Sequence, residues 1–363
     1  MTFRISKSIQ AIKPYEAGKP LKEVEREYGL SNVVKLASNE NPFGISPKVK
    51  AAVEAHLSGM NRYPEPVAHN LCRKLAHRFG VAFDNLVLGN GSDDIIALLA
   101  HGFMDPGDEA VMPLPSFLMY EISVRTAKGV PVMVPLNGVD TNLDGLADAV
   151  TPKTKMVFIT NPFNPTGATL TRDEFDGFAR RLPKDVLIVV DEAYIEFVRD
   201  GSVYNSLDKP LADHRVVTLR TFSKAYGLAG FRIGYGVMDK AVAEILNRIR
   251  QPFNVNSLAQ AAAEAALEDE AFLAQSIQGT HQGIDFLTRE LECMGLEVLP
   301  TQANFLMTDL KTDAKTVFEK MLCKGVIVRS MGAYGFKTCL RVNAGTTEEN
   351  RIFITALKEV LKG

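Results

Sequence analysis

The segment Thr221-Phe222-Ser223-Lys224-Ala225-Tyr226-Gly227-Leu228-Ala229-Gly230-Phe231-Arg232 places one lysine among small and apolar residues, eight positions before an arginine. Burial and a nearby cation both disfavour a charged ammonium group, so they lower the pKa of a lysine and free its amine as a nucleophile. Amines of this kind form Schiff bases. The segment therefore predicts that Lys224 is a reactive amine, with an ordinary surface lysine as the alternative.

Short apolar runs on both sides of this segment alternate with longer amphipathic ones, which is typical of a mostly parallel sheet covered by helices. We predict strands at Leu86–Leu88, Ala110–Met112, Met156–Thr160, Val186–Val190, Val216–Leu219 and Ile233–Val237. We predict helices at Ala68–Phe79, Ile95–Phe103, Phe117–Lys128, Arg172–Arg180 and Lys240–Arg250. Thr171 and Glu174 form a capping box for one of these helices. The expected fold is α/β, with helices on both faces of the sheet.

The pattern changes near residue 255, where long alanine-rich and charged helices are followed by short strands and a last helix after Thr347. We therefore expect a large domain at residues 45–255. Residues 1–44 and 256–363 should form an N-terminal arm and a smaller α+β domain.

Composition excludes several classes of protein. Of the 363 residues, 46% are hydrophobic and 23% charged, which is ordinary for a globular protein. The net charge of -2 does not favour binding to nucleic acid, and the longest apolar run is too short to cross a membrane. No CxxC pair, histidine ligand spacing or secretory signal is present, so we expect a cytoplasmic protein without a metal site.

Glycines follow the first predicted strand at Gly89-Asn90-Gly91-Ser92-Asp93-Asp94 and lead into an apolar helix. Backbone N–H groups at such a helix start can hold a phosphate. Alternatively, Ser92 or Asp93 only caps the helix. Ile95 occupies the place of the third glycine of a dinucleotide fingerprint, and no Walker pattern is present, so neither NAD nor ATP is favoured.

Two further motifs follow predicted strands at their carboxyl ends, where open α/β sheets bind ligands. The first is Asn161-Pro162-Phe163-Asn164-Pro165-Thr166-Gly167, and the second is Asp191-Glu192-Ala193-Tyr194. A carboxylate at the second motif could hold a proton on a ring nitrogen, and Tyr194 could reach an oxygen of the same ring. An Asp–Glu pair could instead bind Mg²⁺, and both motifs could be ordinary connecting loops.

Two arginines are candidates for anion binding. Arg232 has a guanidinium that suits a phosphate and would also lower the pKa of a neighbouring lysine. Arg341 lies within the apolar run Cys339–Val342, where it either pairs with an internal acid or binds an anionic ligand.

In this order the motifs resemble those of the fold-type I pyridoxal-phosphate aminotransferases over nearly the whole chain. The resemblance implies pyridoxal 5'-phosphate as cofactor, with Lys224 as the covalent attachment point and proton carrier. It assigns Asp191 to the ring nitrogen, Asn164 and Tyr194 to the ring's phenolic oxygen, and Phe117 to stacking on the ring. It also assigns to the phosphate the residues Ser92, Asp93, Ser223 and Arg232.

Within that group the chain is similar to the histidinol-phosphate aminotransferases, through Ile12–Tyr15, Lys35–Pro42, Asn61–Pro64, Val326–Arg329 and Leu340–Thr346. The resemblance implies a homodimer with shared active sites, in which Tyr63 reaches the cofactor phosphate of the neighbouring subunit. It places Tyr15, Arg329 and Arg341 on the substrate side. Packing aromatics and surface ion pairs are the alternative roles for these residues.

The implied reaction moves an amino group from histidinol phosphate to 2-oxoglutarate, which yields imidazole-acetol phosphate and glutamate. An aromatic amino acid aminotransferase and a threonine-phosphate decarboxylase are the alternatives on the same fold. A non-catalytic regulator that binds pyridoxal phosphate, and a dinucleotide-dependent oxidoreductase, are alternatives of other classes.

Overall fold

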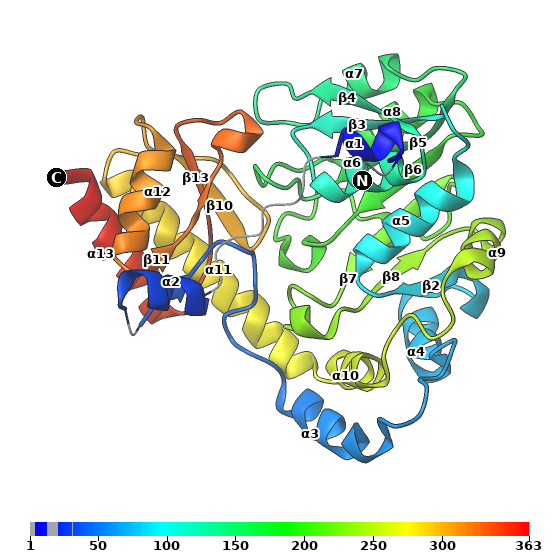
Figure 1. Cartoon of the computed structure of the whole chain (residues 1–363), viewed down its shortest axis with the longest axis horizontal. Coiled ribbons are helices and arrows are strands. Elements are labelled where there is room, and N and C mark those ends of the chain that lie inside the picture. The colour runs from blue at the N-terminus through cyan, green and yellow to red at the C-terminus, as the bar shows by residue number, and fades with distance from the viewer. Residues whose placement is uncertain (1–3, 13–20, 31, 363) are drawn as a thin grey trace.

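The computed structural model describes residues 4–12, 21–30 and 32–362. These residues form two groups of elements around separate sheets, one on each side of Figure 1. The long helix α11 (Glu270–Cys293) runs along the smaller group, and α10 (Ser257–Leu267) precedes it. No helix of the described residues is long and apolar enough to cross a membrane.

The described chain forms a large sheet of seven strands in the order β2-β8-β7-β6-β5-β3-β4. Their bounds are Leu86–Gly89 (β2), Glu109–Leu114 (β3), Val130–Pro135 (β4), Thr154–Thr160 (β5), Leu187–Asp191 (β6), Val216–Thr221 (β7) and Gly234–Val237 (β8). Each of the six strands predicted from the sequence overlaps one of these. The prediction of a mostly parallel α/β sheet is therefore confirmed.

Strand β8 is the exception, because it runs antiparallel to both of its neighbours. The chain between β7 and β8 contains Lys224 but no crossover helix. Residues 222–233 instead fold back through turns and the short 3-10 helix Ala229–Phe231. The lysine segment is therefore the connection between two antiparallel neighbours, and β2 lies beyond β8 at the edge of the sheet.

Helices cover both faces of the large sheet. One face carries α5 (Ser92–Phe103), α6 (Leu118–Thr126) and α9 (Lys240–Ile249), and the other carries α7 (Leu143–Asp148) and α8 (Arg172–Arg181). On β5, Met156 and Phe158 join the first core, while Val157 and Ile159 join the second. All four are 0% exposed, which explains why the strand has no polar face.

The structure tests two expectations about the N-termini of helices. The capping box at α8 is confirmed, because Thr171 accepts from the Glu174 backbone and Glu174 accepts from the Thr171 backbone at 2.7 Å. At α5 the N-cap is Gly91, which has no side chain, and Ser92 and Asp93 are the first two residues of the helix. Neither Ser92 nor Asp93 therefore occupies the N-cap position.

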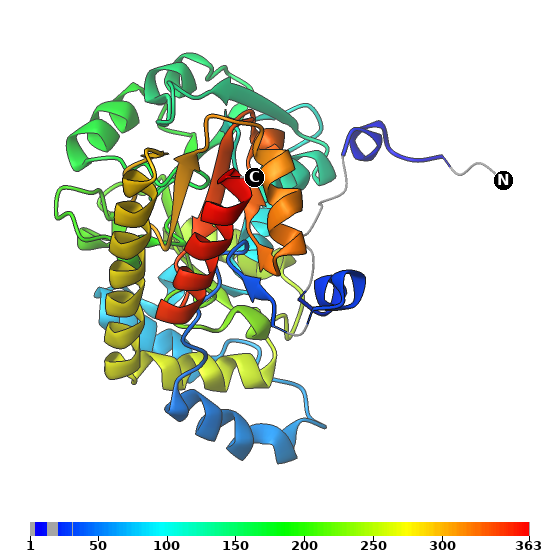
Figure 2. The same ribbon diagram turned by 90° about the vertical axis from the view of Figure 1, so that its left-hand side faces the viewer.

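The smaller group is built on the sheet β12-β13-β10-β9, with strands Arg329–Ser330 (β12), Cys339–Asn343 (β13), Phe305–Asp309 (β10) and Glu297–Val298 (β9). Helices α11, α12 (Ala314–Cys323) and α13 (Thr347–Lys362) pack beside it (Figure 2). Strand β1 (Val34–Lys35) pairs in parallel with β11 (Val326–Ile327), which attaches the N-terminal segment to this group. Short helices α1 (Lys7–Gln10) and α2 (Leu21–Tyr28) precede it.

Some elements are absent from the sequence-based prediction. Strand β4 contains Pro131 and Pro135, which lack N–H donors, and it is tolerated because it lies at the edge of the sheet. Helix α3 (Pro47–His56) was not predicted either; it lies near α10, as does α4 (His69–Phe79), which confirms the helix predicted at Ala68–Phe79. The alanines of α10 complete the core beneath β2 and β8.

Candidate active site

A cavity of about 340 Å³ lies where the carboxyl ends of β5, β6 and β7 meet the start of α5. It is lined by Ser38, Glu40, Ser92, Asp93, Phe117, Thr160, Asn164, Asp191, Ala193, Tyr194, Thr221, Ser223, Lys224, Ala229 and Arg232. Nine of these are residues that the sequence nominated. Segments distant in sequence therefore converge on one site, which is the arrangement expected for a ligand at strand ends.

One part of the cavity is suited to an anion. Helix α5 begins there, so its first N–H groups and the positive end of its dipole face the site. Arg232 lies against Gly91, where a Cβ would come within 2.6 Å of the Arg232 Nη2 atom. Gly91 also has φ of +89°. The backbone conformation thus favours glycine, and a side chain here would displace the Arg232 guanidinium from its place.

Asp93 partly balances the positive charge of Arg232 in this part of the cavity. The Arg232 guanidinium lies 3.5 Å from a carboxylate oxygen of Asp93, and both side chains are about two-fifths exposed. Burial raises the pKa of Asp93, while Arg232 and Lys224 oppose that shift. A dianionic phosphate would find the guanidinium, the helix start and the hydroxyls of Ser92 and Ser223 on the lining of one cavity.

Asp191 ends β6 and is 4% exposed. Burial raises its pKa to about 6, and hydrogen bonds from Tyr120 and from the Ala193 backbone act against that rise. The Tyr120 hydroxyl donates to Asp191 at 2.8 Å, and the Ala193 N–H donates at 3.1 Å. A carboxylate held in this way can stabilise a positive charge on a ligand in the cavity.

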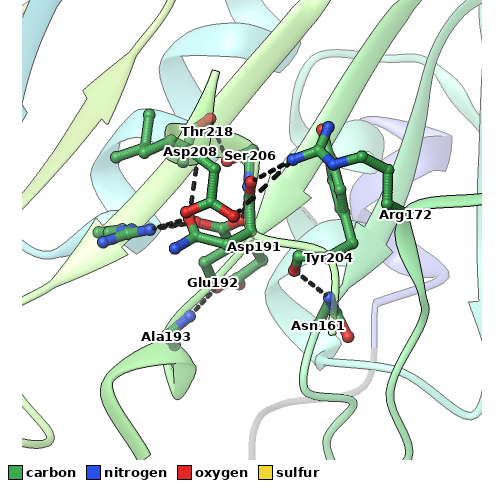
Figure 3. A network of polar contacts seen from close by, with 12 residues as sticks. Asn161, Arg172, Asp191, Glu192, Ala193, Tyr204, Ser206, Asp208 and Thr218 are labelled. Atoms are coloured by element: carbon green, nitrogen blue, oxygen red, sulfur yellow. Dashed lines mark hydrogen bonds and ion pairs between the residues drawn. The ribbon is translucent and has the colours of Figure 1, made fainter. Parts of the chain in front are cut away.

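Glu192 turns away from the cavity into a separate polar network (Figure 3). It accepts from Arg220 at 2.8 and 3.0 Å and from the Ser206 N–H at 2.7 Å, and its side chain is 0% exposed. In the same network the Ser206 and Thr218 hydroxyls are 2.7 Å apart. Asp191 and Glu192 therefore have different partners and different roles.

The sequence left open that Asp191 and Glu192 bind Mg²⁺ together. Among residues 4–12, 21–30 and 32–362, no group of three or more His, Cys, Asp and Glu side chains is placed to hold a metal ion. The charge of Glu192 is matched by Arg220 instead.

Lys224 has the environment expected of a reactive amine. Its Nζ atom lies 3.4 Å from the Ser38 carbonyl oxygen and 5.7 Å from the centre of the Tyr194 ring. Burial lowers the pKa of Lys224 to about 8, with Arg341 as the next cause and Glu40 acting in the opposite direction. Most of the amine is therefore still protonated at neutral pH, but its uncharged fraction is far larger than in an ordinary lysine.

Arg341 and Arg329 of the smaller sheet are not on the cavity lining, although Arg341 contacts a residue that is. Arg341 donates to Asn164 at 2.6 Å and to the Ala37 carbonyl oxygen at 2.9 Å. Arg329 lies directly opposite Arg341 across β12 and β13, so both side chains stand on the same face of the sheet. The Tyr194 hydroxyl, which lines the cavity, accepts a hydrogen bond from the side-chain amide of Asn39 at 3.0 Å.

Of two further tyrosines implied by the resemblance, only Tyr63 belongs to the described residues. Tyr63 is 82% exposed and stacks on Phe253, with ring centres 4.7 Å apart, so it does not line the cavity of its own chain. Tyr15 lies outside the described residues.

The sequence analysis missed several residues at or beside the site. Ser38 and Glu40 belong to a segment that carried the family resemblance but received no role, and Asn39 lies between them. Thr160 ends β5 immediately before the Asn161–Gly167 motif, so its position at a strand end could have identified it. Tyr120 lies within the predicted helix Phe117–Lys128, and no sequence pattern distinguishes it from the other aromatic and apolar residues there.

Comparison with known proteins gives consistent results. A family model of the class I and II aminotransferases matches residues 31–357. Histidinol-phosphate aminotransferase 2 of Carboxydothermus hydrogenoformans is 46% identical over 359 residues, which cover 99% of both chains. The histidinol-phosphate aminotransferase of Moorella thermoacetica is 44% identical, covering 98% of this chain and 92% of that one. The crystal structure of histidinol-phosphate aminotransferase from Sinorhizobium meliloti in complex with pyridoxal-5'-phosphate aligns with a TM-score of 0.92 at 28% identity, covering 100% and 98% of the two chains.

Proposed function

Because the chain belongs to the class I and II aminotransferases, we propose that it transfers the amino group of histidinol phosphate to 2-oxoglutarate, with pyridoxal 5'-phosphate as cofactor. The products are imidazole-acetol phosphate and glutamate, and the reaction belongs to histidine biosynthesis. The observation that carries the proposal is the single cavity in which Lys224, with its lowered pKa, faces Asp191 and an anion-binding helix start.

The residues of the cavity fit the proposed cofactor. Ser92, Asp93, Ser223 and Arg232 would hold its phosphate, and Asp191 its ring nitrogen. Tyr194 and Asn164 would contact the phenolic oxygen, with Phe117 against the ring face. When bound, the cofactor supplies an electron sink for the charge that develops as the substrate's α-proton leaves.

The protein's own residues carry out the remaining steps. Lys224, whose pKa is lowered by burial, would accept at its Nζ atom the proton that leaves the substrate carbon and would then donate it again. Asp191, held ionised, would stabilise a positive charge on the ring nitrogen. Arg341 and Arg329, on one face of the smaller sheet, bind the anionic end of the substrate.

The paired arginines explain how two substrates could share one site. Histidinol phosphate carries a phosphate where glutamate carries its α-carboxylate, and a guanidinium fork suits both groups. Arg341 is 8% exposed, so a dianion there would be held with little competition from water.

Substrate choice can be tested by following the visible absorbance of the holoenzyme in stopped flow. We expect histidinol phosphate to discharge the cofactor about 100-fold faster than phenylalanine or tyrosine at equal concentration, because its dianionic phosphate carries more negative charge toward Arg341 and Arg329 than an α-carboxylate does. A faster reaction with phenylalanine would favour an aromatic aminotransferase. Release of CO₂ from threonine phosphate would favour a decarboxylase, and a protein that does not respond to added pyridoxal phosphate would contradict the whole proposal.

We also propose a cytoplasmic homodimer in which each subunit completes the other's site through Tyr63. Support comes from the exposed apolar side chains of one short segment, Leu57 (56%), Met60 (40%), Tyr63 (82%) and Val67 (45%). Burial of such a patch against a second copy is a common reason for its exposure.

The proposed domain division places residues 45–255 in the large cofactor-binding domain and residues 1–44 with 256–363 in the smaller part. The pairing of β1 with β11 supports the attachment of the N-terminal segment to the smaller part. Helix α10, just beyond residue 255, packs in the core of the large sheet's group.

Hybrid dimers test the shared site. Mixing Lys224→Ala subunits with Tyr63→Ala subunits, after unfolding and refolding together, should restore activity that neither variant has alone. One site of each hybrid would then carry both substitutions, and the other neither. If Tyr63 served only its own subunit, every hybrid site would carry one defect, and the mixture would stay as inactive as its parts.

A further inference from the structure

Tyr120 is a buried residue in direct contact with Asp191. It is 0% exposed, its ring stacks on Phe158 with centres 4.6 Å apart, and it meets Phe117 edge to face at 5.7 Å. Its hydroxyl donates to Asp191 at 2.8 Å and lies 2.8 Å from the Thr160 hydroxyl. Since a phenol has one proton and Asp191 accepts it, Thr160 must donate to Tyr120.

The result is a directed chain of hydrogen bonds from Thr160 through Tyr120 to Asp191. It joins the end of β5, the start of α6 and the end of β6. Stacking on Phe158 fixes the plane of the phenol, so the hydroxyl has little freedom to leave the carboxylate.

We propose that Tyr120 is a positioning residue that holds the Asp191 carboxylate ionised and in one orientation toward the ring nitrogen. This inference rests on the proposed function, because it concerns how Asp191 serves that ring.

The charged groups around Asp191 explain why its carboxylate needs a hydrogen-bond donor such as Tyr120. Asp93 from α5 and the adjacent Glu192 are both negative and, with burial, favour the protonated form of Asp191. Tyr194 also lies within interaction range. Among the described residues, Tyr120 and the Ala193 N–H are the groups that donate to this carboxylate.

A hydrogen bond to the charged form of an acid lowers its pKa, and a donor lost from a buried carboxylate is costly. Without the Tyr120 hydroxyl, the Ala193 N–H would be the one donor to Asp191 left among the described residues. That N–H bonds to a single carboxylate oxygen, Oδ1. The second oxygen, Oδ2, is the one that Tyr120 holds. The pKa of Asp191 should therefore rise further, and its orientation should loosen.

Tyr120→Phe removes only the hydroxyl. Tyr235→Phe is the matched control, since Tyr235 is also buried, at 2%, but packs in the core on the other side of β2 and β8. We expect the dissociation constant of pyridoxal phosphate, measured by titrating apoprotein, to rise about 10- to 100-fold in Tyr120→Phe. The acid limb of the affinity against pH should move to higher pH, because Asp191 would protonate earlier. The kcat should fall by a similar factor, with little change in KM for the amino donor.

Thr160→Val is a second variant, which removes the donor to Tyr120 and leaves the phenol in place. It should shift the same acid limb in the same direction by a smaller amount, and it tests the inference if Tyr120→Phe does not fold. If both variants match Tyr235→Phe in affinity and pH profile while wild type binds the cofactor, the inference is wrong. If wild type itself does not bind pyridoxal phosphate, the proposed function fails instead.

Discussion

Replacing Lys224 by alanine is expected to lower kcat by about 10⁴-fold or more, because the variant loses both the covalent attachment point and the proton carrier. The cavity and its anion-binding groups would remain, so the variant should still bind pyridoxal phosphate, although without a covalent bond. Activity assays, together with borohydride treatment followed by mass spectrometry, measure both effects. Wild type should retain the cofactor on Lys224 after reduction, and the variant should not.

Lys240→Ala is a suitable control, because Lys240 is about three-fifths exposed and pairs with Asp84 at 2.9 Å. It should behave as wild type. The pH dependence adds a second check, since the pKa of Lys224 is lowered to about 8. The amine is mostly protonated below that pH, so capture of pyridoxal phosphate by apoprotein should accelerate as the pH rises and level off above about 8. Arg341→Gln removes a cation that lowers this pKa, and it should move the midpoint upward.

Glu192→Gln is expected to destabilise the fold by about 3–5 kcal/mol, because it leaves the buried Arg220 guanidinium without its counter-charge. Arg220 is 9% and Glu192 0% exposed, and Glu192 also accepts from the Ser206 backbone in the network of Figure 3. The measurement is the free energy of unfolding in urea at pH 7 without added cofactor. No comparable loss is expected at an exposed ion pair.

Asp84→Asn provides that comparison, since Asp84 and Lys240 form a pair about three-fifths exposed on both sides. Its cost should stay within about 1 kcal/mol. Replacing both Glu192 and Arg220 by methionine should restore part of the lost stability, because neither member of the pair then leaves the other without its counter-charge. The recovery should be incomplete, because Glu196 also loses Arg220 as a neighbouring cation. If the double variant were as unstable as the sum of its single variants, the pair would not be the source of the effect.

The sequence was sufficient to predict the framework of the molecule. The alternation of strands and helices, the reactive Lys224 and the polar motifs after strands all follow from local rules. Apolar runs buried on both faces predict internal strands, and a motif directly after such a strand lies at its carboxyl end. The same rules missed strand β4, because prolines argue against an internal strand and do not by themselves indicate an edge strand.

Which side chains meet was decided only by the tertiary structure. Asp191 and Glu192 are adjacent in the sequence, yet one lines the cavity and the other pairs with Arg220 on β7. Arg329 and Arg341 share a face because two short strands lie in register. The Tyr120 hydroxyl on helix α6 reaches Asp191 at the end of β6, 71 positions away along the chain. Propensity and spacing describe neighbours along the chain, whereas these contacts depend on how separate elements pack, and that packing sets the burial, the charges and the pKa values of the site.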